Sequence, residues 1–174
     1  MKKTPLQKIA QADNQSQSAH GIIKLLIADH KLMRDLMKKI KSKQATPAQI
    51  KSAYKELIKT VASHVTAEEK TFLSLIKDNP VFEDMALEGY EEHRVHETVI
   101  NGIKKVKDQK RQIEQMKIFC EILEHHLDEE EEDLFPRFRN YAAKATKKKI
   151  GKKFLAVRKK TNKTGKNKGA TRFA

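Results

Sequence analysis

Apolar residues recur every three or four positions along most of this chain, which is the period of an amphipathic helix. Short polar segments divide the pattern into four stretches. The spacing predicts helices over residues 18–43, 46–77, 81–103 and 112–135. Composition agrees, because Lys, Glu, Leu, Ile and Ala are abundant, aromatic residues make up only 6% and Trp is absent. We therefore expect an all-α protein.

Three local signals mark the ends of these helices. Residues 46–49 read Thr-Pro-Ala-Gln, which combines a hydroxyl cap, a proline at the first helical position and a capping-box glutamine. Pro80 should stop the second helix, because the residue before a proline is disfavoured in helical conformation. Pro136 is predicted to end or kink the fourth helix near Phe135, since proline disrupts the turn that precedes it.

Four amphipathic helices with short connections pack most simply as an up-down-up-down four-helix bundle, which we predict for residues 18–142. Residues 1–17 are polar without periodicity and are predicted to be a flexible leader. Residues 143–174 form a Lys-rich C-terminal tail. Within this tail, 145–160 carry a weak apolar stripe that predicts a short helix docked on the bundle, and 161–174 are expected to be disordered.

The formal net charge of +14 is concentrated at one end of the chain. Residues 134–174 contain 15 Lys or Arg and no acidic residue, which leaves 22 basic residues against all 23 acidic ones in the preceding part. The body is therefore close to neutral. The basic segment 144–174 suits an electrostatic contact with nucleic acid or an anionic membrane, and equally a solubilising extension.

Several function classes find no support in the sequence. No run approaches the roughly 18 to 20 apolar residues of a transmembrane segment, and the N-terminus lacks the apolar core of a signal peptide. The single Cys120 cannot form an internal disulfide. We therefore expect a cytoplasmic protein.

Candidate chemistry lies on the apolar faces of the helices. A histidine occupies the apolar stripe of each predicted helix, and a glutamate follows four residues after two of them; the six residues are His30, His64, Glu68, His93, His126 and Glu130. Residues four apart share a helix face. One buried histidine is more often structural than ligating, but burying all six without partners would be costly. The set favours two cations such as iron or manganese, with carboxylates able to bridge.

The two halves of the body also repeat one another. Each half contains a helix with a histidine, followed by a helix with a His-x-x-x-Glu-Glu motif, at residues 64–69 and 126–131. The order of His30, these two motifs, the Glu-Glu-His segment at 91–93 and the Leu-Phe-Pro at 134–136 resembles the hemerythrin-like, or HHE cation-binding, domain over residues 22–141.

The resemblance implies a four-helix bundle holding two irons that are bridged by the two carboxylates and an oxo or hydroxo group. Manganese and zinc are the alternatives to iron. Carried over position by position, it makes the six residues above the metal ligands. It also implies an open position that meets O₂, peroxide or nitric oxide, so we expect a protein that binds, senses or detoxifies such a ligand, with peroxide turnover as the enzymatic version. Iron buffering or transfer is the alternative function.

The chain departs from the pattern of reversible oxygen carriers at two positions. Those carriers have a histidine and an aspartate where this sequence has Glu97 and Glu131. This difference speaks against a dedicated O₂ carrier and leaves open whether either glutamate also ligates. His96 and His125 are expected to flank the site and His20 to lie outside it. Four acidic residues of the fourth helix are predicted to form a solvated face; they are Glu129, Glu131, Glu132 and Asp133.

Overall fold

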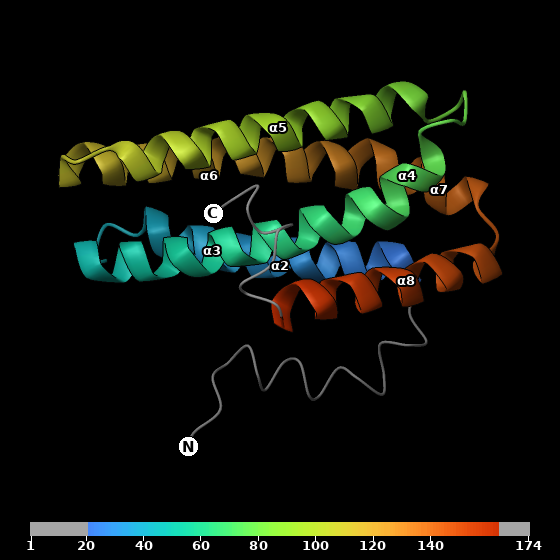
Figure 1. Ribbon diagram of the computed structural model, residues 1–174, viewed down its shortest axis with the longest axis horizontal. Coiled ribbons are helices and arrows are strands. Elements are labelled where there is room, and N and C mark those ends of the chain that lie inside the picture. The colour runs from blue at the N-terminus through green and yellow to red at the C-terminus, as the bar shows by residue number, and fades with distance from the viewer. Residues whose placement is uncertain (1–20, 164–174) are drawn as a thin grey trace, which may run out of the picture.

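The computed structural model describes residues 21–163, which are helical apart from short connections and contain no strand. Four long helices alternate in direction and pack side by side (Figure 1). They are α2 (Ile22–Lys41), α3 (Pro47–Glu68), α5 (Glu83–Lys105) and α6 (Gln109–Glu129). The predicted all-α bundle is confirmed. The leader predicted for residues 1–17 lies outside the described residues.

Two of the long helices continue through a π-helical turn into a further short helix. The turn η2 (Glu69–Leu73) joins α3 to α4 (Ser74–Ile76), and the turn η3 (Glu130–Leu134) joins α6 to α7 (Phe135–Tyr141). In a π-helical turn the backbone bonds span five residues instead of four, so each turn accommodates one extra residue and changes the direction of the side chains that follow.

The predicted capping box is present at the start of α3. The Gln49 backbone N–H donates to the Thr46 hydroxyl at 3.3 Å, and the Thr46 backbone N–H donates to the Gln49 side chain at 2.8 Å. The helical segment that begins there ends at Ile76, before Pro80, as the sequence predicts. The first helix ends at Lys41, two residues earlier than expected, because Ser42 is extended.

The helix end predicted near Phe135 is wrong. The chain remains helical through Pro136 as far as Tyr141. Pro136 lies in the first turn of α7, where a missing N–H costs little, and the wide turn η3 precedes it. The continuation keeps Phe135 and Phe138 buried against the rest of the bundle.

Two apolar clusters fill the bundle, one toward each end. The first includes Met37, Leu57 and Phe119, and the second includes Phe72 and Phe135. Along α2, the residues of the second cluster precede position 30 and those of the first cluster follow it. The buried histidines and glutamates singled out by the sequence therefore lie in a layer between the two apolar clusters, at the middle of the bundle.

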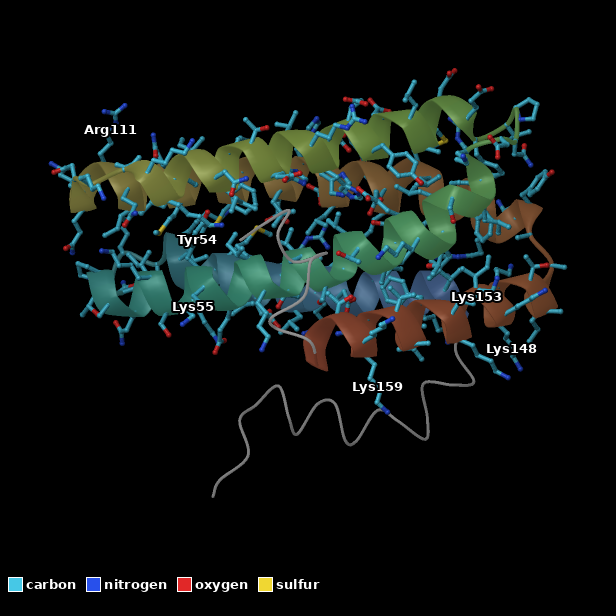
Figure 2. All side chains as sticks on the ribbon, viewed as in Figure 1. Tyr54, Lys55, Arg111, Lys148, Lys153 and Lys159 are labelled. Carbon is cyan, nitrogen blue, oxygen red and sulfur yellow. The ribbon has the colours of Figure 1, made fainter. Side chains whose placement is uncertain are left out.

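A fifth long helix, α8 (Lys144–Lys163), follows the bundle and packs along α2 and α3 (Figure 1). The docked helix predicted for 145–160 is thus present, and it is slightly longer than expected. Its buried residues Ile150 and Phe154 belong to the second apolar cluster. Figure 2 shows Lys148 and Lys159 pointing away from the bundle, and Lys153 is exposed. An anionic partner for this face stays a prediction, and residues 164–174 lie outside the described part.

None of the helices between residues 21 and 163 combines the length and the apolar character that a membrane crossing requires.

Candidate metal centre

The structure brings together all six residues singled out by the sequence. They come from α2, α3, α5, α6 and the first residue of η3, and their exposed fractions are 4% or less; they are His30, His64, Glu68, His93, His126 and Glu130. Each occupies the apolar face of its helix, as the spacing predicts. The four helices therefore surround a buried polar layer.

These residues form two groups of possible metal ligands. His30, His64 and Glu130 make up the first group, and Glu68, His93 and His126 make up the second. Within each group the ligand atoms lie within 4.8 Å of one another. Each group takes two histidines from one half of the chain and its glutamate from the other half.

Both carboxylates also span the two groups. Glu68 Oε2 lies 3.3 Å from His64 Nε2 in one group and 3.6 Å from His93 Nε2 in the other. Glu130 Oε2 lies 3.2 Å from His30 Nε2 and 3.9 Å from His126 Nε2. One oxygen of each glutamate is thus close to both groups, which is the placement expected of a carboxylate that bridges two cations.

The atoms that face this centre have no hydrogen-bond partner. They are the Nε2 atoms of the four histidines and both carboxylate oxygens of Glu68 and Glu130. Their mutual approaches of 3.2 to 3.9 Å do not meet the distance and angle requirements of a hydrogen bond. Buried polar atoms without partners are costly, and a cluster of them needs an explanation. Cations bound between these atoms would satisfy all of them, so the residues present fit a two-metal centre.

The opposite ring nitrogen of every one of these histidines contacts a carboxylate. His64 Nδ1 lies 3.4 Å from Asp29, and His126 Nδ1 lies 2.5 Å from Glu92. Each acid comes from the other helix of the same hairpin. Asp29 directly precedes His30, and Glu92 directly precedes His93. An Nδ1–H that donates to a carboxylate fixes the ring and leaves the Nε2 lone pair directed at the centre.

The remaining two histidines receive their carboxylates from the other half of the chain. His93 Nδ1 lies 3.1 Å from Glu69, and His30 Nδ1 lies 2.8 Å from Glu131. Each of these acids directly follows a glutamate that faces the centre. The two glutamates of each doublet therefore point to different places, one into the centre and one onto a histidine of a neighbouring helix.

The π-helical turns lie where these doublets occur. Glu68 is the last residue of α3 and Glu69 the first of η2, while Glu130 and Glu131 begin η3. π-Helical turns inside α-helices are frequent at functional sites. Here each turn begins at a doublet in which one glutamate faces the centre and the next one contacts a histidine Nδ1.

Burial and neighbouring charges lower the pKa of two of the four central histidines and raise that of the other two. Burial lowers the pKa of His30 and of His93. Burial alone would also lower the pKa of His64, but the carboxylates of Glu68 and Asp29 outweigh it and raise that pKa to about 10. The pKa of His126 is raised against burial as well, chiefly by Glu130.

The two central glutamates are shifted in opposite directions. Burial and the nearby Glu68 carboxylate raise the pKa of Glu130 to about 8. Burial would raise the pKa of Glu68 too, but His64 and the other imidazoles lower it to about 2. Two carboxylates this close do not both ionise readily without a cation, so the metal-free centre holds protons at neutral pH.

The two further histidines that the sequence places beside the site lie in different environments. His96, expected to flank the site, is buried, and its ring centroid lies 5.0 Å from that of His126. Burial, followed by the neighbouring histidines, lowers its pKa to about 2, so it is neutral. Its position three residues after His93 was the available signal. His125 is largely exposed and pairs with Glu129.

The two glutamates left open by the sequence lie outside both ligand groups. Glu97 is partly exposed. Glu131 departs from the solvated face predicted for it, because it contacts the buried His30 and the guanidinium of Arg34. That hydrogen bond to His30 lowers the pKa of Glu131 to about 2, with Arg34 acting in the same direction.

A helical bundle with two facing, buried groups of histidine and glutamate defines a metal-binding helical protein. The family model of the hemerythrin HHE cation binding domain matches residues 21–138, and the chain belongs to this family. Comparisons with the curated proteins and with the solved structures found no match. The match stops before α8.

Arg34 generates a prediction about the support of this centre. Its guanidinium contacts Glu124 at 2.7 Å, Asp128 at 2.6 Å and Glu131 at 2.6 Å, and so ties α2 to α6 and η3. We expect Arg34→Gln to lower the free energy of unfolding of the metal-free protein by about 1–3 kcal/mol, because charged hydrogen bonds in a network are lost. Urea unfolding measures the loss, which should shrink in high salt.

The matched control is Arg94→Gln. Arg94 is largely exposed and pairs with Glu91 on its own helix, so its replacement should change the free energy of unfolding by no more than about 0.5 kcal/mol. Equal losses in the two variants would contradict a special role for the Arg34 network.

Proposed function

We propose that this protein holds two irons at the centre of the bundle and binds, senses or detoxifies O₂, peroxide or nitric oxide. The proposed ligands are the six residues of the two groups, His30, His64, Glu68, His93, His126 and Glu130. One observation carries the proposal: eight buried ligand atoms converge without a hydrogen-bond partner while every Nδ1 behind them has one.

The donor set supports iron or manganese over softer cations. It contains only imidazole nitrogen and carboxylate oxygen, and Cys120 is in neither group. Such mixed nitrogen and oxygen donors suit iron or manganese, whereas thiolate would favour softer metals. Three ligands per group, with shared carboxylates, also differ from the closed four-ligand site of structural zinc. Manganese and zinc are the alternatives that metal analysis would detect.

The surroundings of the centre support a small, uncharged ligand. Apolar clusters lie on both sides, and the Phe135 ring centroid is 5.4 Å from that of His30. These side chains exclude bulk water and leave little room for a large substrate. Bound iron would supply one-electron redox chemistry toward O₂, peroxide or nitric oxide. The protein's own contribution is to fix the four imidazoles through their Nδ1 carboxylates and to keep the centre dry.

The alternative function, iron buffering or transfer, would use the same six residues. It differs in the fate of the bound iron, which would be released without reacting with O₂, peroxide or nitric oxide. The cytoplasmic location expected from the sequence stays a prediction under either function.

Metal content tests the ligand assignment. Protein loaded with ferrous iron without oxygen should contain about two irons per chain. His64→Ala and Glu130→Ala should each lose at least half of that metal, since each removes a ligand and Glu130 lies near both groups. His125→Ala is the matched control, because this exposed histidine adjoins His126 and lies outside both groups. Full metal in the His64 and Glu130 variants, with helicity unchanged, would refute the assignment.

The pKa shifts predict that metal loading depends on pH. His64, with a pKa of about 10, and Glu130, with a pKa of about 8, both carry a proton at pH 7 in the metal-free protein. His64 faces Asp29 from α2, Glu68 from its own helix and Glu130 from η3. Since a cation binds the deprotonated forms, loading at pH 7 should release protons, and the apparent affinity should fall as the pH falls below 8.

A weakly buffered titration with a pH indicator measures this release. We expect at least about two protons per chain from His64 and Glu130, with a further contribution from His126, whose pKa is also raised. The His125→Ala variant should release the same number. Proton-free loading, or an affinity that stays constant between pH 6 and 8, would contradict the assigned protonation states.

Reaction with an oxidant separates the two functions. Ferrous protein mixed with O₂, peroxide or nitric oxide should change its visible absorption faster than it loses metal to a chelator. Zinc-loaded protein should show no change, because zinc has no redox chemistry. A spectral change that only follows the release of iron would favour buffering or transfer.

A further inference from the structure

Helix α8 lies outside the residues matched by the family model, but its inner face reaches the metal centre. Phe154 is fully buried, and its ring centroid lies 6.1 Å from that of His64. Arg158 Nη2 lies 2.7 Å from Asp29 Oδ1. The other oxygen of Asp29 lies 3.4 Å from His64 Nδ1. A continuous set of contacts therefore runs from α8 through Asp29 to a proposed ligand.

The equivalent place in the other half of the chain is built differently. There Glu92 contacts His126 as Asp29 contacts His64, but the carboxyl group next to Glu92 is that of Glu129. The side chain of Glu92 is 25% exposed, against 2% for Asp29. One half of the centre thus has a guanidinium and a helix over its supporting acid, whereas the other has a second acid and solvent.

The buried position of Asp29 makes Arg158 important. A buried carboxylate is costly unless it is paired, and breaking such a pair leaves an uncompensated charge. Arg158 satisfies one oxygen and thereby holds the other toward His64. Ile150 and Phe154 anchor α8 in the apolar cluster beneath, which keeps the guanidinium in place.

We propose that α8 covers the His64 side of the centre, and that Arg158 is a positioning residue acting through Asp29. This inference rests on the proposed function, because it concerns how the centre retains metal. Arg158 fixes Asp29, Asp29 fixes the imidazole of His64, and Phe154 shields that ring from water. The cation of this half is therefore released more slowly than it would be without α8.

Release of iron to a ferrous chelator tests the proposal on the full chain. Arg158→Met removes the guanidinium but keeps an apolar stem of similar length. We expect the release rate of one of the two irons to rise about tenfold or more, as for other outer partners of metal-bound histidine, and the second iron to be affected less. Arg158→Lys keeps the positive charge and should restore most of the retention.

The matched control is Lys159→Met, the same change at the next residue. Lys159 points away from the bundle (Figure 2), so its replacement should leave the release rates unchanged. The Arg158→Met change is also made in the Asp29→Asn variant, which tests whether Arg158 acts through the Asp29 carboxylate. If Arg158 acts through Asp29, adding Arg158→Met to that variant should change release by less than about twofold, because changes along one chain of contacts are not additive.

The outcomes separate this inference from the proposed function. A wild-type protein that holds no metal would overturn both. Two irons in the wild type, with unchanged release from the Arg158→Met variant, would overturn the role of α8 alone. Equal acceleration with and without Asp29→Asn, accompanied by a lower free energy of unfolding, would show that Arg158 only docks the helix and would overturn its positioning role.

Discussion

The cost of burying charged groups without partners constrains the rest of this structure. Four imidazoles and two carboxylates lie between two apolar clusters, and the atoms that face the middle of the bundle have no hydrogen bond. Everything behind those atoms is satisfied, because each Nδ1 contacts an acid. The unsatisfied atoms of these six residues therefore all face the same place. A protein core tolerates such a cluster when something cationic occupies it.

The sequence was sufficient to predict the six central residues because their signal is local. Spacings of three and four place a histidine or glutamate on the apolar stripe of a helix whatever that helix packs against. The capping box before α3 was predictable for the same reason, since it involves residues 46–49 alone. The weak apolar stripe of α8 was enough to predict a docked helix. It was not enough to predict the contacts of that helix with Asp29 and His64.

The missed features depend on neighbours that are distant in sequence. Asp29 and Glu92 gain their roles only when another helix brings a histidine beside them. His93 and His96 share one face of α5, so the rotation of that helix had to be known before the contact of His96 with His126 could be predicted. The continuation through Pro136 required the π-helical turn before it, which spacing alone does not reveal. Arg158 lies in a lysine-rich helix, and nothing in the sequence distinguishes this one inward-facing cation from the exposed lysines around it.

The exchange of acids between the two halves makes each half incomplete by itself. The first helical hairpin supplies two histidines to one group and its glutamate to the other, and the second hairpin does the same in return. Glu69 and Glu131 repeat this exchange one layer further out. The arrangement has the reciprocal form of a twofold-symmetric interface, in which each partner gives what it receives. A pair of identical hairpins could therefore build the same centre as a symmetric dimer, and a chain cut between its hairpins would keep the centre only while the fragments stay together.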